Sequence, residues 1–138
     1  MSAGYSQRPL AAKLGIKPGS RAYFSHSPEG YLAALGDVVA MLAISPDLIS
    51  PLDFIHHFVT ERKALEADFP RLKAVLAQDG MLWISWPKGQ SKSAIATDLD
   101  ENIVRDVGLR NGLVDVKICA IDAIWSGLKF VYRLTDRA

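Results

Sequence analysis

The stretch from Leu113 to Leu134, LVDVKICAIDAIWSGLKFVYRL, decides the fold, because it holds two strand-like segments with no helix between them. Leu113–Ala120 is rich in β-branched and apolar residues. Leu128–Leu134 alternates apolar residues with Lys129, Val131 and Arg133. Only residues 121–127 join the two segments, and parallel strands need a longer crossover. We therefore expect an antiparallel pair at one edge of a sheet.

The rest of the chain alternates strands with helices. Strands are expected at Arg21–Ser25, Val38–Ile44 (for which a helix stays open), Leu52–Val59 and Met81–Trp86. Pro70 is expected to break or kink the helix that follows Thr60, and Thr97 with Asp100 has the spacing of a capping box. Single helices between strands imply right-handed crossovers and a largely parallel sheet. The sequence predicts a three-layer α/β/α Rossmann-like fold of about six strands in the order 2-1-3-4-6-5, with an antiparallel last strand.

Composition limits the classes of protein to consider. The length of 138 residues suits one domain, so we expect residues 1–138 to form a single domain in which residues 1–8 are loose. The net charge of +1 argues against broad attraction to nucleic acid or to an anionic membrane. No stretch approaches the roughly 20 apolar residues that span a bilayer, and the N-terminus lacks an apolar signal core. We expect a cytoplasmic protein, either a monomer or a homodimer.

Six sequence words span nearly the whole chain: Gly4–Ser6, Pro9–Lys17, Leu52–His56, Met81–Lys88, Val114–Asp122 and Trp125–Val131. Together they resemble a bacterial domain family of unknown function, which implies a family but no activity. The expected strand order is also similar to a class I methyltransferase-like Rossmann fold that lacks one βα unit. The terminal antiparallel strand is the shared feature. This second likeness is one of architecture, and a fold does not carry a function with it.

A cofactor on such a sheet would bind just after the first strand, where glycines let the backbone approach the ligand. Here the turn reads Ser25-His26-Ser27-Pro28-Glu29-Gly30, and no Gly-x-Gly occurs in the chain. Pro28 removes a backbone donor, and Glu29 places a negative charge in the first helical turn. We therefore expect no cofactor: neither S-adenosylmethionine (SAM) nor a nicotinamide nucleotide should bind.

The three histidines do not form a metal site in the sequence. His56 and His57 are adjacent on a strand, so their side chains should point to opposite faces and cannot chelate one ion together. His26 has no second ligand at helical or loop spacing. We predict no metal, and we expect one of the adjacent pair to be a hydrogen-bonded core histidine between sheet and helix.

The single cysteine, Cys119, excludes an intramolecular disulfide. Lys117 lies two residues away and could lower the pKa of the thiol, so a reactive cysteine stays open beside a buried structural one. Lys117 could equally form an ion pair with Asp115 on one face of the strand.

Ligands bind at the carboxyl edge of open α/β sheets. Trp86 ends the fourth expected strand, and Trp125 lies in the connector after the fifth. The candidate ligand-binding residues at this edge are Trp86, Lys88, Asp122, Trp125 and Ser126, with Ser91, Lys92, Lys117 and Cys119 as weaker candidates. Two indole rings with a lysine would suit a small anionic ligand. The same side chains could instead plug the end of the sheet.

Three functions remain open on the sequence. The main interpretation is a non-enzymatic domain of a bacterial cytosolic protein that binds a small ligand or regulates another activity. The alternatives are a degenerate methyltransferase-like enzyme and an interaction protein that dimerises. The missing glycine-rich turn argues against the enzyme. The absence of Ser-His-Asp, metal-ligand and paired-carboxylate patterns argues against hydrolase chemistry.

Overall fold

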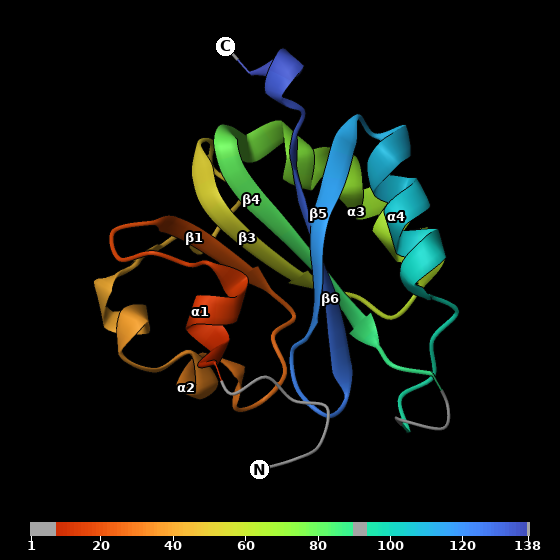
Figure 1. The fold of residues 1–138 in the computed structure, drawn as a ribbon, viewed down its shortest axis with the longest axis horizontal. Coiled ribbons are helices and arrows are strands. Elements are labelled where there is room, and N and C mark those ends of the chain that lie inside the picture. The colour runs from red at the N-terminus through yellow and green to blue at the C-terminus, as the bar shows by residue number, and fades with distance from the viewer. Residues whose placement is uncertain (1–7, 90–93, 138) are drawn as a thin grey trace.

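A twisted six-stranded sheet lies between two layers of helices in the computed structural model, which describes residues 8–89 and 94–137 (Figure 1). The helices are α1 (Leu10–Leu14), α2 (Tyr31–Leu35), α3 (Arg62–Val75) and α4 (Glu101–Arg110). The strands are β1 (Arg21–Ser25), β2 (Ala43–Ile44), β3 (Leu52–Phe58), β4 (Leu76–Pro87), β5 (Leu113–Ala120) and β6 (Trp125–Tyr132). Two 3₁₀ helices cover Gly36–Met41 and Leu134–Asp136. None of the helices in the described ranges is long and apolar enough to cross a membrane.

The sheet has the order β2-β1-β3-β4-β6-β5, as the sequence predicts. β1 runs parallel to β2 and β3, and β3 runs parallel to β4. β6 is antiparallel to both β4 and β5. The three-layer, mostly parallel α/β/α fold with an antiparallel last strand is therefore confirmed.

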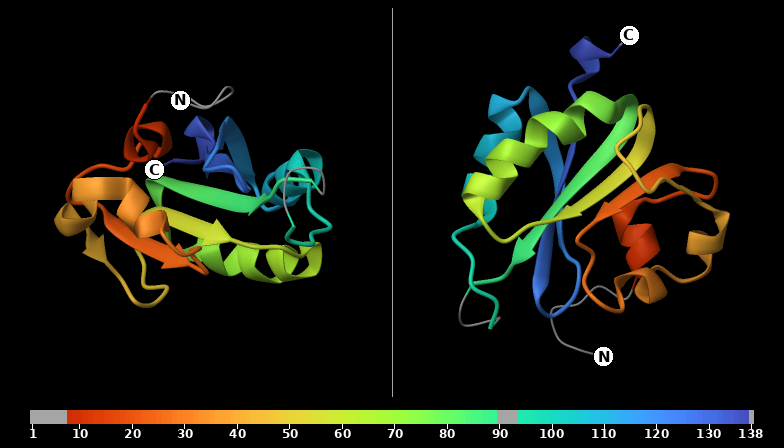
Figure 2. Two further views of the ribbon diagram at one scale, coloured as in Figure 1. Left: turned by 90° about the horizontal axis from the view of Figure 1, so that it is seen from below. Right: turned by 180° about the vertical axis from the view of Figure 1, so that it is seen from behind.

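The core has two halves, one on each face of the sheet. On one face α3 and α4 bury Leu65, Phe69 and Val104 against the sheet. On the other face α1 and α2 bury Leu14 and Tyr31. Figure 2 shows these helix layers from two further sides. Both halves depend on the same central strands, so the sheet positions whatever lies at its two edges.

The second expected strand is much shorter than predicted. Val38–Ile44 begins in the 3₁₀ helix Gly36–Met41, and only Ala43 and Ile44 pair with β1. Val38 and Val39 are partly buried and pack against the apolar cluster beneath α1 and α2. The run is apolar because it covers this cluster, not because it is a buried strand.

Two element boundaries in the middle of the chain also differ from the prediction. α3 continues through Pro70 as one helix, and β4 begins directly after it at Leu76. Gly80 therefore lies within β4 and does not end a helix. An ideal Cβ on Gly80 would lie 3.0 Å from the carbonyl oxygens of Leu52 and Asp53, so a side chain would crowd the neighbouring strand.

The cap of α4 is also one turn away from the expected one. Asp100, not Thr97, is the N-cap of α4, and its carboxylate accepts a hydrogen bond from Ile103 N at 2.8 Å. The Thr97 hydroxyl instead donates to Thr60 O at 2.6 Å. Thr97 thus connects the segment before α4 to Thr60, which follows β3.

Gly108 tests the contact between α4 and the sheet. An ideal Cβ on Gly108 would lie 2.0 Å from Cε1 of Phe130 in β6, so Gly108→Ala must push α4 off the sheet. We expect a loss of about 1–3 kcal/mol in the free energy of unfolding, although alanine gains helix propensity. Urea denaturation measures this loss. The control is Gly89→Ala, where no atom of residues 8–89 and 94–137 lies within 4 Å of the added Cβ. Equal stability of Gly108→Ala and the wild type would contradict the packing described here.

Candidate functional site

Two adjoining cavities open at the carboxyl ends of β1 and β3. The first has a volume of about 330 Å³ and lies against Phe58, Thr60 and Trp125. The second has a volume of about 250 Å³ and lies against Ser25, His57 and Arg71. His26 and Asp68 line both cavities. We call this pair of cavities the carboxyl-edge cleft.

The turn after β1 and one side of α3, from Ala64 to Leu72, line the cleft. His26 has a φ of 58°, which places a non-glycine residue in the left-handed region directly after β1. Its ring lies edge-on to the ring of His57, with centroids 5.9 Å apart. Such backbone outliers often occur at functional sites, where the surrounding structure holds them in place.

His57 contacts a carboxylate at the cleft. Its Nε2 atom lies 3.1 Å from Oδ2 of Asp68, and Oδ1 of the same carboxylate accepts a hydrogen bond from Arg71 at 2.6 Å. A carboxylate only accepts, so His57 carries a proton on Nε2. Burial lowers the pKa of His57, and the nearby Asp68 opposes this effect only in part. The neutral ring therefore presents a lone pair at Nδ1.

Two polar atoms at this edge lack a partner. Ser27 Oγ and His57 Nδ1 are the buried side-chain atoms without a hydrogen-bond partner in the described part of the chain. Ser27 lies in the turn after β1, and His57 lies near the end of β3. Leaving such an atom unpaired costs about 1–3 kcal/mol, so native structures retain it chiefly where water or a ligand satisfies it.

His56 faces the other side of the sheet and is structural. It is fully buried and lies between the hydroxyls of Tyr31 and Ser85, the latter 2.7 Å from Nε2. Burial, and then the neighbouring His57, lowers its pKa well below the usual value. The predictions that the two rings point to opposite faces and that one is a core histidine are confirmed. In residues 8–89 and 94–137, no group of three or more His, Cys, Asp or Glu side chains could hold a metal ion.

Trp86 and Trp125 do not wall one pocket, and this part of the sequence prediction is wrong. β6 begins at Trp125, not after it, and Trp125 pairs with Pro87 while Ser126 pairs with Trp86. Paired residues share a face, so Trp86 lies among the side chains of the α3 layer and Trp125 among those of the α1 layer. Only Trp125 reaches the carboxyl-edge cleft.

Lys88 and Asp122 do come together, although not through an ion pair. Lys88 Nζ donates to the backbone carbonyl of Asp122 at 2.9 Å. The Asp122 carboxylate instead accepts from the backbone N–H groups of Ile124 and Trp125, both at 2.8 Å, and so closes the turn between β5 and β6. Ligand binding by these residues stays a prediction. Ser91 and Lys92 lie outside the described residues.

Lys117 does not form the ion pair with Asp115 that the sequence left open. The pairing of β5 with β6 shifts between these two residues, so Val116 is extra and Lys117 turns to the opposite face. Asp115 pairs with Arg105 at 2.8 Å, whereas Lys117 donates to the carbonyl of Lys13. Burial raises the pKa of Cys119, and the nearby lysines only partly offset it. This environment disfavours a thiolate.

Sequence reasoning missed Asp68, Arg71 and Thr60 as site residues. Asp68 is eleven positions after His57 and comes back to it only through the turn into α3. The available signal was an acid and an arginine three residues apart on one helix. Without the geometry that brings His57 beside α3, an acid and an arginine three residues apart indicate only a surface ion pair.

No family model matches this chain, and no curated protein matches it. Solved structures do match. Magnesium protoporphyrin IX methyltransferase from Synechocystis PCC 6803 with bound SAH has a TM-score of 0.63 at 13% identity, over 90% of this chain and 80% of that one. The chain thus has a methyltransferase-like Rossmann fold. A TehB-like SAM-dependent methyltransferase from Corynebacterium glutamicum has a TM-score of 0.55 at 12% identity, over 95% and 91% of the two chains. Fibrillarin from Aeropyrum pernix, with natively bound S-adenosyl-L-methionine, has a TM-score of 0.54 at 10% identity, over 88% and 73%.

The residues after β1 do not fit the cofactor that this fold implies. His26 occupies the left-handed position with a side chain, and Pro28 offers no backbone donor. α2 has only five residues and no side-chain cap. A nucleoside ligand needs close backbone approach at this turn, which glycine normally provides. The absence of SAM binding stays a prediction, and no chemical step is derived through SAM.

The two buried histidines predict how stability depends on pH. The folded state lowers the pKa of both His56 and His57, so their contribution is present above the unfolded pKa of about 6.5 and is lost as the pH falls below it. We expect the free energy of unfolding, measured with urea, to fall from pH 7.5 to pH 5. In His57→Asn the fall should be smaller, because one buried imidazole is gone. A stability that is unchanged or higher at pH 5 would contradict the burial of neutral rings.

Proposed function

We propose that this protein is a degenerate methyltransferase-like enzyme that binds a small polar substrate in the carboxyl-edge cleft and uses His57 as its acid–base group. The structural neighbours favour this interpretation over a non-enzymatic domain, although the likeness is one of fold. The observation that carries the proposal is the unpartnered Nδ1 of His57, buried at the edge where α/β sheets bind ligands. A neutral imidazole with one free nitrogen is a suitable general base.

Each cleft residue has a distinct role in this proposal. Asp68 fixes the Nε2–H tautomer of His57, and Arg71 holds the Asp68 carboxylate in place. His57 Nδ1 then accepts a hydrogen bond, and in the reaction a proton, from a hydroxyl or amine of the substrate. Trp125 supplies an apolar wall in the larger cavity.

A non-enzymatic ligand-binding domain is the second candidate. The turn after β1 favours it, because a side chain and a proline replace the glycine cradle. The same cleft would then hold a ligand without converting it. Binding of a small anion beside Lys88 belongs to this second candidate and rests on the Lys88 contact with the turn at Asp122.

An untargeted metabolite assay separates these functions. The full chain is incubated with a small-metabolite extract, with and without added SAM, and the mixture is followed by mass spectrometry. We expect the wild type to consume at least one metabolite without added SAM, and His57→Phe to consume none. Asp68→Asn should slow consumption at least tenfold, because the His57 proton would no longer be held on Nε2.

The matched control is Asp106→Asn, because Asp106 also forms an ion pair with a nearby arginine on a helix, Arg110, but lies in α4. It should retain full activity. Circular dichroism verifies that each variant is folded. Saturable binding without consumption would overturn the enzyme in favour of the binding domain. Consumption that requires SAM and adds a methyl group would show that the turn after β1 does accept the cofactor.

A further inference from the structure

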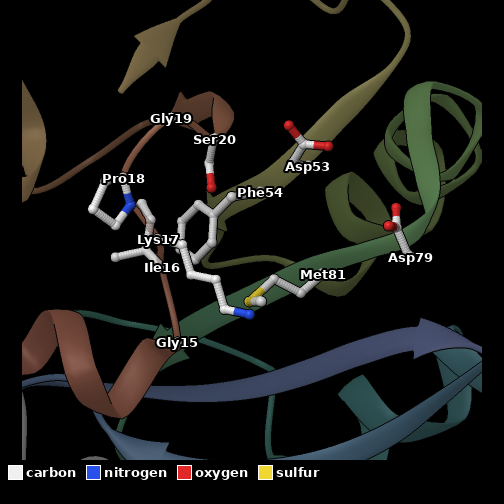
Figure 3. Close-up of a pocket in the computed structure, with 10 residues that line it drawn as sticks. All are labelled: Gly15, Ile16, Lys17, Pro18, Gly19, Ser20, Asp53, Phe54, Asp79 and Met81. Atoms are coloured by element: carbon white, nitrogen blue, oxygen red, sulfur yellow. The ribbon is translucent and has the colours of Figure 1, made fainter. Parts of the chain in front are cut away.

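A separate cavity of about 310 Å³ lies at the opposite edge of the sheet, at the amino ends of β1, β3 and β4 (Figure 3). The loop Gly15–Ser20 forms one wall, and Phe54 with Met81 forms the floor. Asp53 and Asp79 complete the lining. We call it the amino-edge pocket. The function proposed above does not use it.

The loop over this pocket is held in one conformation. Gly15 and Gly19 have φ values of 74° and 84°, in the left-handed region that favours glycine. Gly15 N donates to Ala11 O at 3.0 Å at the end of α1, and Gly19 N donates to Met41 O at 2.6 Å. The pocket therefore exists before any ligand arrives, which lowers the entropic cost of binding.

Two ammonium groups lie at this wall. The Lys17 side chain extends along the pocket toward Met81 (Figure 3). The Lys129 ammonium is close to Gly15 in the same wall. An ideal Cβ built on Gly15 would lie 3.9 Å from Lys129 Nζ and 3.8 Å from Met81 Sδ. Within residues 8–89 and 94–137, neither ammonium has a hydrogen-bond or ion-pair partner.

The other lysines on this face are already satisfied. Lys13 Nζ donates to Ala120 O at 2.7 Å, and Lys117 Nζ donates to Lys13 O at 2.6 Å. Partial burial lowers the pKa of Lys129, and the like charges of Lys117 and Lys17 lower it further. An anion between Lys17 and Lys129 would relieve this repulsion and gain charge-assisted hydrogen bonds.

The two carboxylates of the pocket are not equivalent. Asp53 is occupied by Arg21, which donates to Oδ2 from its backbone N at 2.9 Å and to Oδ1 from Nη2 at 3.0 Å. Asp79 accepts no hydrogen bond and forms no close ion pair in the described residues, although its charge also interacts with that of Arg21. It lies across the pocket from Lys17 (Figure 3). The pocket is thus positive at one end and has an available carboxylate at the other.

We propose that the amino-edge pocket binds a small dipolar molecule, with its acidic group on Lys17 and Lys129 and its ammonium group on Asp79. The Ser20 hydroxyl points into the cavity from the same loop and can donate to the acidic group. The volume lies near the lower limit of about 300 Å³ for ligand pockets, so the ligand has the size of an amino acid. The acidic group is a carboxylate or a phosphate.

Titration of the ¹⁵N-labelled full chain tests this proposal with four probes: phosphoethanolamine, β-alanine, inorganic phosphate and ethanolamine. We expect a dipolar probe to shift the amide signals of Gly15, Lys17, Gly19 and Ser20. It should bind about tenfold more tightly than phosphate, because it adds the contact to Asp79. Whichever of phosphoethanolamine and β-alanine binds more tightly identifies the acidic group.

Charge-removing variants locate the two ends of the ligand. Lys17→Met and Lys129→Met should each weaken both dipolar probes about tenfold. Asp79→Asn should weaken only the dipolar probes and leave phosphate unchanged. Lys63→Met, an exposed lysine on α3, is the matched control and should change nothing.

The proposal would be overturned by no shift in the loop with any probe, by equal affinity in Lys17→Met, or by equal affinity for phosphate and both dipolar probes. Shifts confined to the carboxyl-edge cleft would also overturn it. His57→Phe separates the two sites, because it should abolish the cleft activity and leave this titration unchanged.

Discussion

The alternation of side chains along β4 is the constraint on which the rest of the structure depends. Leu82, Ile84 and Trp86 enter the half of the core beneath α3 and α4, and Trp83 enters the half beneath α1 and α2. β4 is also where the sheet changes direction, with parallel β3 on one side and antiparallel β6 on the other. A shift of one residue in β4 would exchange both faces at once.

The same strands fix the two edges of the molecule. The carboxyl edge is tied together by Val59 N donating to Ser85 O at 2.9 Å, and by the Thr97 hydroxyl donating to Thr60 O. Just beyond them the chain turns from β3 into α3, and His57 Nε2 lies 3.1 Å from Asp68 Oδ2. The amino edge depends on other elements, the loop after α1 and the starts of β3 and β4. The two edges can therefore bind different ligands without sharing a residue.

Patterns that repeat along the chain were predictable from the sequence. The helix-free connector after Leu113–Ala120 correctly gave the antiparallel end of the sheet, and strand geometry correctly gave opposite faces for His56 and His57. Both inferences use only local periodicity and connector length, which can be read from a single sequence.

The candidate site was less predictable, because it depends on single-residue details. The prediction that Trp86 and Trp125 share a pocket failed because β6 starts at Trp125, which puts the two indoles on opposite faces. An extra residue at Val116 turned Lys117 away from Asp115. Bulges and strand starts leave no reliable signal in one sequence, and the approach of Asp68 to His57 requires the folded turn between β3 and α3.

The proposed acid–base role of His57 depends on the protonation state of its ring. A long-range ¹H–¹⁵N NMR spectrum of the histidine side chains at pH 7.5 observes that state directly. We expect His57 to be neutral, with the proton on Nε2 against Asp68 and an unprotonated Nδ1, and Asp68→Asn to disturb that tautomer. A substrate in the carboxyl-edge cleft should then shift the Nδ1 signal. A proton on Nδ1, or a ring charged at this pH, would contradict the assignment of His57 as the acid–base group of this protein.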